Sequence, residues 1–127
     1  MVRSLRAFGH EVYDFREPIP GLRGFAWSEI DPEWINWTPA KFRDALNHPI
    51  AQAGFKMDKM GMDNSEVCVL LLPCGRSAHA EAGYMAGQEK PVIVCIPEPC
   101  EPELMYGLFG NRIATTPEEL FSMLDRL

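Results

Sequence analysis

Two uninterrupted apolar runs limit what this chain can fold into. The first extends from Val67 to Leu72 and the second from Val92 to Ile96, and prolines bound both of them. Strands that are apolar at every position are typical of parallel sheets covered on both faces. The segment between the runs opens with Gly75-Arg76-Ser77 and continues in a helical pattern. The pattern predicts two parallel strands joined by a helix whose N-terminus lies at the carboxyl edge of the sheet, where α/β proteins bind ligands.

The predicted helix carries a carboxylate close to its start, Glu81. Small residues and one tyrosine recur at helical spacing, and we expect this face to pack on the sheet: Ala80, Gly83, Tyr84 and Gly87. Glu81 falls on a different face. A carboxylate near a helix N-terminus is ordinarily a surface residue that complements the helix dipole. Beside a predicted ligand edge, an anionic nucleophile is the competing interpretation.

Composition limits the class of partner. With 127 residues and 46% hydrophobic content, the chain can bury one core, which predicts a single domain over residues 1–127. A net charge of -6 argues against a broad electrostatic footprint for duplex nucleic acid. A local anion site at Arg76 remains compatible with this charge. We therefore expect no nucleic acid polymer as a partner.

The four cysteines include no C-x-x-C pair, and they are Cys68, Cys74, Cys95 and Cys100. Two of them lie inside predicted buried strands, so we expect them to be reduced and to act as small apolar side chains. No metal site and no organic cofactor is indicated. No apolar run reaches membrane-spanning length and the N-terminus lacks a signal-peptide core, which predicts a cytoplasmic protein without membrane contact.

The remaining elements follow from capping, turn and periodicity signals, with Thr38-Pro39 and Thr116-Pro117-Glu118-Glu119 as helix starts. We expect a helix over residues 2–8, a strand over 10–15, a loop over 16–30, helices over 38–48, 49–62 and 103–109, a strand over 112–115, and a closing helix from 116. The helix over residues 49–62 is predicted to bury a stripe formed by Ile50, Ala53, Met57, Met60 and Gly61. Asp58 lies off the centre of this stripe, so its residue context alone favours a solvated carboxylate.

The loop and the segment after it are rich in aromatic residues, namely Phe25, Trp27, Trp34 and Trp37. A satellite core under the loop is the more ordinary role for most of them. The alternative is that Trp27 stacks on a nucleobase or sugar, since aromatic faces suit bases.

The run G-R-S-A-H-A-E-A-G-Y over residues 75–84, followed by G-Q-E-K-P-V-I-V over 87–94, resembles the nucleoside 2-deoxyribosyltransferase family. That family includes the 2'-deoxynucleoside 5'-monophosphate N-hydrolases. Asp58, eight residues before Glu66, matches the acidic residue of the family on the helix before the strand. The resemblance covers nearly the whole chain and implies a three-layer, mostly parallel, flavodoxin-like or Rossmann-like α/β fold. The first strand of the family is missing, and we expect a start codon placed downstream of the true one rather than a sheet without a central strand.

The resemblance implies cleavage or transfer of the N-glycosidic bond of 2'-deoxynucleosides or their 5'-monophosphates. Glu81 would be the nucleophile that forms a covalent glycosyl-enzyme, and Asp58 would contact the departing base or sugar and assist proton transfer. The substrate-binding candidates are Gly75, Arg76 and Ser77 at the 5' end, with Trp27 and Tyr84. The resemblance also implies a homo-oligomer in which a neighbour completes the site, through a segment containing Glu103, Met105 and Tyr106.

Two other functions compete with this hypothesis. One is a nucleotide-binding or assembly module of the same fold without turnover. The other is a zinc deaminase, because His79-Ala80-Glu81 and Pro99-Cys100 match part of its H-x-E and P-C-x-x-C signature. Glu103 stands where that signature needs its second cysteine, so we set the deaminase aside.

Overall fold

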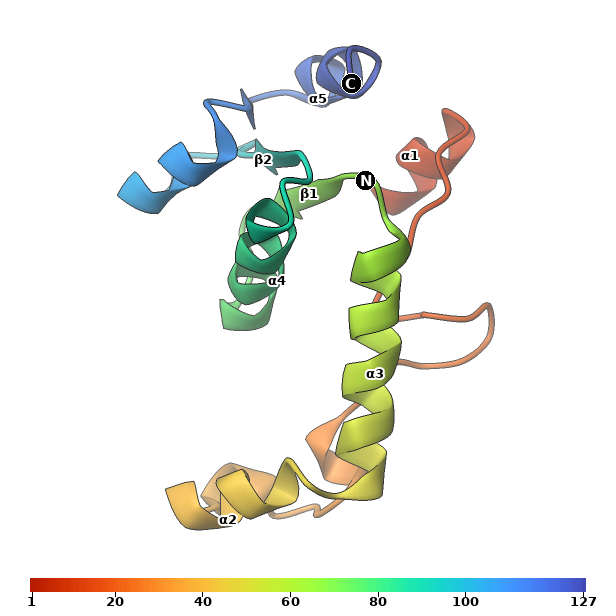
Figure 1. Ribbon diagram of the computed structural model, residues 1–127, viewed down its shortest axis with the longest axis vertical. Helices are drawn as coiled ribbons and strands as arrows, with labels where there is room; N and C mark the ends of the chain where they lie inside the picture. The colour runs from red at the N-terminus through yellow and green to blue at the C-terminus, as the bar shows by residue number, and fades with distance from the viewer. The chain divides into compact units, whose positions relative to one another are not determined.

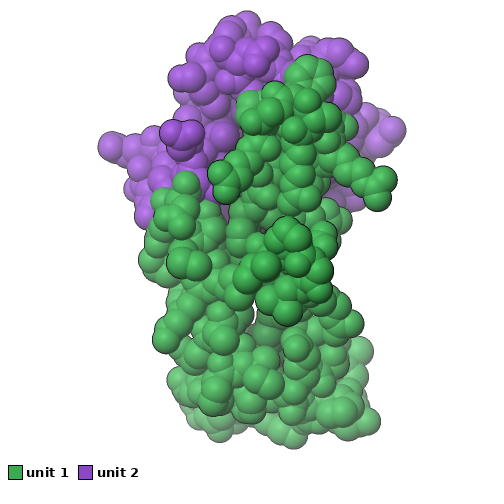
Figure 2. Space-filling model, turned by 90° about the vertical axis from the view of Figure 1, so that its right-hand side faces the viewer, with its two compact units in different colours: residues 1–64 green, residues 65–127 purple.

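The computed structural model describes residues 1–127, and the chain divides into two compact units, residues 1–64 and 65–127 (Figure 2). That both belong to one domain stays a prediction. No helix in either unit is both long and apolar enough to cross a membrane.

A parallel three-stranded sheet forms the centre of the second unit (Figure 1). Its strands are β1 (Cys68–Leu71), β2 (Val92–Cys95) and β3 (Ile113–Ala114), in the order β1-β2-β3. All four residues of β2 are buried, as expected for a central strand that is apolar at every position. The two predicted parallel strands are confirmed, and the unit is α/β in character.

Helices cover this sheet where the sequence predicts them. α4 (Arg76–Gly87) packs against β1 and β2, and α5 (Pro117–Leu124) packs against β2 and β3. Between them lies η3 (Leu104–Phe109), a 3-10 helix that ends at Gly110 with a left-handed φ of 65°. A glycine takes this conformation without the strain that a Cβ would introduce.

The start of α5 differs in one detail from the expected capping box. The Thr116 hydroxyl accepts a hydrogen bond from the Glu119 backbone N–H at 3.2 Å, as predicted. The Glu119 carboxylate, however, forms its close backbone bond one residue earlier, by accepting from the N–H of Thr115 at 2.7 Å. It also accepts from the Thr115 hydroxyl at 2.8 Å, so two donors one residue earlier hold it there.

The face of α4 that packs on the sheet is not the predicted one. Ala82 and Met85 are 0% and 2% exposed, whereas Gly83 and Gly87 are exposed and a Cβ on either would meet no atom within 4 Å. The long Met85 side chain fills more of the core than Ala80, Gly83 or Gly87 could. Burying it sets the rotation of the helix, because apolar area removed from water is the dominant favourable term.

The first unit is helical. It contains α1 (Val2–Ala7), α2 (Pro39–Ala45), α3 (Pro49–Asn64) and two short 3-10 helices, η1 (Trp27–Glu29) and η2 (Trp34–Asn36). The predicted helices are confirmed, and the Thr38 hydroxyl caps α2 by accepting from the Lys41 N–H at 3.2 Å. The predicted strand over residues 10–15 is wrong, since no strand forms there. No β-ladder includes this segment, and a strand needs a ladder partner.

The packed face of α3 also differs from the prediction. Ile50 and Met60 are 38% and 59% exposed, while Ala51 is buried. A Cβ at Gly54 would lie 2.9 Å from Phe25, and one at Gly61 would lie 2.7 Å from the Tyr13 ring. Rings from the preceding loop therefore pack where the helix has no side chains. The apolar partners come from the loop, and a search for apolar residues on the helix itself misses this face.

The loop before α2 is held by its own hydrogen bonds. Arg16 forms a bidentate pair with Asp14, with both N–O distances at 2.9 Å, and its carbonyl accepts from the Gly24 N–H at 2.9 Å. A side chain at Gly24 would collide with the carbonyl oxygen of Phe15. The predicted loop with fixed turns is confirmed, and Gly24 closes it where only a glycine fits.

Acid is expected to weaken the first unit through Asp31. Hydrogen bonds from the Trp37 indole, the Glu33 N–H and Lys41 lower the pKa of Asp31 from 3.8 to about 2. A lowered folded-state pKa stabilises the fold above the unfolded value, and the contribution is lost as the pH falls towards about 2. The difference in melting temperature between wild type and Asp31→Asn should thus shrink from about pH 4 to about pH 2. Tryptophan fluorescence measures it, since all three tryptophans lie in this unit.

The matched control for this prediction is Asp44→Asn. Asp44 pairs with Arg43 at 3.7 Å on the exposed surface, where an ion pair contributes little. A difference for Asp31→Asn that stays constant down to pH 2 would contradict the assignment.

Candidate functional site

The residues that open α4 follow directly on the carboxyl end of β1, as the sequence predicts. Gly75 is the N-cap, with an extended backbone and no side-chain capping bond, and a Cβ there would meet no atom within 4 Å. Arg76 and Ser77 are exposed. The first backbone N–H groups of this 12-residue helix therefore face an open position beside a guanidinium. Such groups favour an anion.

Glu81 lies on α4 beside the buried Ala82 and is half-buried. Burial, followed by the negative charges of Glu81 and Cys74, raises the pKa of Cys68 to about 11. The Glu81 charge thus acts on the thiol of a β1 residue. Glu81 is therefore not fully solvated.

His79 bonds at both ring nitrogens within its own unit. Nδ1 lies 2.9 Å from the Gly75 carbonyl oxygen, and Nε2 lies 2.8 Å from the Tyr106 hydroxyl. A carbonyl only accepts, so the neutral ring carries its proton on Nδ1 and accepts from Tyr106 at Nε2. Nδ1 also lies 3.7 Å from the Cys74 sulfur, but with its proton committed to Gly75 it cannot act as a base for that thiol. His79 thus ties η3 to the first turn of α4.

The segment expected to complete the site of a neighbouring copy, which contains Glu103, Met105 and Tyr106, has both exposed and buried residues. Met105 is 57% exposed, as expected for an interface residue, and the Glu103 carboxylate accepts from the Met105 N–H at 2.9 Å. Tyr106 is only 8% exposed and stacks on Phe109 with ring centroids 6.0 Å apart. The Tyr106 ring therefore packs in the core of its own unit, and its hydroxyl bonds to His79.

Asp58 lies on α3, in the first unit, and is half-buried. Its Oδ1 accepts a hydrogen bond of 2.7 Å from the Tyr13 hydroxyl. The solvated carboxylate favoured by residue context alone is therefore wrong. The sequence analysis did not identify Tyr13 as the partner of Asp58. The one indication was that a tyrosine, which carries a hydroxyl, lies in the segment predicted to be a strand.

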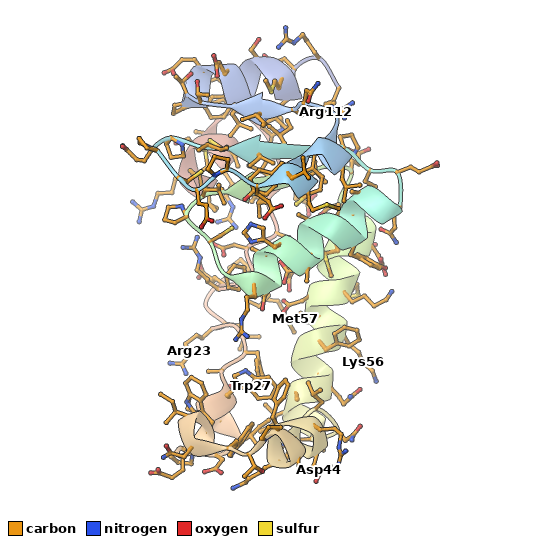
Figure 3. The ribbon with its side chains drawn as sticks, turned by 90° about the vertical axis from the view of Figure 1, so that its left-hand side faces the viewer. Arg23, Trp27, Asp44, Lys56, Met57 and Arg112 are labelled. Carbon is orange, nitrogen blue, oxygen red and sulfur yellow. The ribbon has the colours of Figure 1, made fainter.

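Trp27 lies in an aromatic cluster of the first unit (Figure 3). Phe25, Trp37 and Phe42 approach it edge to face, with centroid distances of 4.7, 5.7 and 5.7 Å. Such pairs stabilise a small core. The role of Trp27 in a satellite core thus accounts for its contacts without any ligand. That Trp27 stacks on a nucleobase stays a prediction.

Tyr84 is half-buried on α4 and accepts a hydrogen bond of 3.0 Å from the Gln88 side chain. It shares its helix with the α4 candidates Gly75, Arg76, Ser77 and Glu81, whereas Asp58 and Trp27 belong to the other unit.

No family model, curated protein or solved structure matches this chain.

Hollows on the second unit lie away from these candidates. One of about 420 Å³ is lined by α5 and Ile113, and one of about 210 Å³ is lined by residues that include Lys90 and Arg112. Neither is lined by Glu81 or the Gly75 turn. No group of three or more His, Cys, Asp or Glu side chains is arranged to hold a metal ion.

Proposed function

We propose that this protein cleaves or transfers the N-glycosidic bond of 2'-deoxynucleosides or their 5'-monophosphates through a covalent intermediate on Glu81. The observation that carries the proposal is the place of Glu81. It is a half-buried carboxylate whose charge acts on Cys68 of β1, on a helix whose N-terminus carries the exposed Arg76. A carboxylate held this way suits attack on a sugar, and the open helix start suits the anionic end of a nucleotide.

The chemistry follows that of a retaining glycosidase. A Glu81 oxygen bonds to C1' of the deoxyribose while the bond from C1' to the base nitrogen breaks. The base leaves with the electron pair of that bond and takes up a proton. Water or a second base then attacks C1' and releases Glu81, which gives hydrolysis or transfer respectively.

We also propose the three-layer, flavodoxin-like form of the fold for the second unit. What supports it is that α4 and α5 lie on opposite sides of the sheet (Figures 1 and 3). The order β1-β2-β3 leaves β1 paired on one side only. A further parallel strand at that edge would complete a sheet of this kind.

Direct assay tests the function. The purified protein is incubated with each of the four deoxynucleosides and their 5'-monophosphates, and free base is measured by chromatography with and without a second base as acceptor. Free base without acceptor indicates hydrolysis, and a new nucleoside with acceptor indicates transfer. Binding of a nucleotide without any base release would support the non-catalytic module instead.

Arg76→Ala is expected to weaken the recognition of monophosphates selectively. A charge-assisted bond from the guanidinium to phosphate contributes about 1.5–3 kcal/mol, so KM for the monophosphate should rise roughly 10-fold to 100-fold. KM for the free nucleoside should stay within about twofold, since no phosphate is present to lose the contact. Arg126→Ala, at an exposed position near the end of the chain, is the matched control. Equal losses on both substrates would contradict a phosphate role.

A further inference from the structure

A hollow of about 210 Å³ lies at the amino edge of the sheet in the second unit. Its lining includes Lys90, two residues before β2, and Arg112, which directly precedes β3. Because β2 and β3 are parallel, the residues that precede them meet at one edge, and Figure 3 shows Arg112 beside the sheet. The Gly75 turn follows the carboxyl end of β1 and so belongs to the opposite edge. The hollow is therefore distinct from the site of the proposed function.

Basic side chains are scarce in this unit, and half of them line the hollow. Residues 65–127 contain nine acidic residues and four basic ones, which are Arg76, Lys90, Arg112 and Arg126. Lys90 and Arg112 are far apart in sequence, so the fold brings them together. Leu108 and Phe109 line the hollow beside them. Cations along an apolar wall attract an anion more strongly than the same charges in open water.

The backbone holds both cations in place. The N–H of Lys90 donates to a carbonyl in the last turn of α4 at 3.1 Å, and Lys90 is half-buried. The carbonyl of Arg112 accepts from a backbone N–H of β2 at 2.8 Å. The residues directly before the two cations, Glu89 and Asn111, have left-handed φ angles of 61° and 59°. Non-glycine residues in this conformation are uncommon, and they occur preferentially at functional sites.

The ordinary interpretation is that each cation complements a helix end. Lys90 follows the C-terminus of α4, and Arg112 donates to the Phe109 carbonyl at the end of η3. At 3.4 Å this bond is longer than a usual N–H···O bond, and it uses one of the five guanidinium donors. Complementing two separate helix ends does not require that both cations line one hollow. That interpretation predicts lost stability on substitution and no bound ion.

We propose that this hollow binds a hydrogen phosphate ion. The guanidinium of Arg112 and the ammonium of Lys90 suit the oxygens of a tetrahedral anion. Glu89 also lines the hollow, and its carboxylate repels an anion that offers it no hydrogen bond. Hydrogen phosphate carries an O–H group that can donate to this carboxylate, whereas sulfate carries none at neutral pH. The volume is below the range of about 300–1,000 Å³ that is usual for larger organic ligands, which agrees with a small ion.

The test is a titration of the isotope-labelled protein with inorganic phosphate and, separately, with sulfate at neutral pH, followed by amide chemical shifts. Phosphate should shift the amides of residues 89–92 and 108–113 with a Kd on the order of 1 mM, and should bind about tenfold tighter than sulfate. Glu89→Gln should remove this preference, because an amide can donate to either ion. Arg112→Gln should weaken phosphate binding roughly tenfold to 100-fold.

Arg126→Gln is the matched control, since it removes an exposed basic residue of the same unit that does not line this hollow. It should change the Kd for phosphate by less than about twofold, because exposed charges are screened. The amide spectrum of each variant also shows whether it is folded.

Three outcomes would overturn the proposal: no phosphate-dependent shifts at the amino edge, equal losses in Arg112→Gln and Arg126→Gln, or equal affinity of the wild type for phosphate and sulfate. Shifts confined to residues 74–78 would belong to the first of these and would assign the anion to the Gly75 turn. Base release is not part of the measurement, so this inference and the proposed function succeed or fail separately.

Discussion

Replacing Glu81 by alanine is expected to abolish base release. If Glu81 is the nucleophile, its removal leaves no group to form the covalent intermediate, and the rate should fall by at least about 10³-fold, or about 4 kcal/mol in barrier height. Glu81→Gln should behave the same way, because an amide of the same shape cannot attack C1'. The measurement is single-turnover base release, and mass spectrometry of the quenched wild type should detect a deoxyribosyl adduct on Glu81.

The matched control is Glu66→Ala, which removes an exposed carboxylate two residues before β1. It should leave the rate unchanged. A dipole-complementing Glu81 predicts a different pattern, in which Glu81→Ala costs a few tenths of a kcal/mol to about 1 kcal/mol of stability and leaves kcat intact. Retained activity in Glu81→Gln would therefore remove the central residue of the proposed mechanism.

The strands of the second unit could be predicted because their signal is local. Runs that are apolar at every position and bounded by prolines have few alternatives, and β1 and β2 lie within one or two residues of the predicted bounds. The cap at Thr116 is local as well. By contrast, the hydrogen bond between Tyr106 and His79 joins residues that lie 27 apart in sequence, and no local sequence pattern predicts it.

The predictions of which faces of α3 and α4 are buried were wrong for a related reason. On α4, small residues at positions 80, 83 and 87 form as regular a stripe as positions 78, 82 and 85, and the volume of Met85 decides between them only once the sheet is present. On α3, the packed face contains Ala51, Gly54, Asp58 and Gly61, in which Ala51 is the one apolar side chain. Rings from the loop fill it, so Asp58 is half-buried through partners that hydrophobic periodicity cannot identify.

The same fold predicts where the second unit is most sensitive to substitution. Ile93 lies in the middle strand of the sheet and is 0% exposed, whereas Ile113 on the neighbouring strand β3 is 38% exposed. Ile93→Ala should lower the free energy of unfolding by about 2–5 kcal/mol, from lost burial and the cavity left behind. Ile113→Ala removes the same atoms from a partly solvated site and should cost about 1 kcal/mol or less.

Urea unfolding followed by circular dichroism compares the two variants, with Ile93→Val as an intermediate step of about 0.5–1.5 kcal/mol. The tryptophans all lie in the first unit, so hydrogen exchange at the backbone amides of β2 provides the local readout. Equal losses for Ile93→Ala and Ile113→Ala would mean that β3 is as deeply covered as β2. A further strand or a partner would then have to lie against the β3 edge, because the unit itself leaves Ile113 exposed.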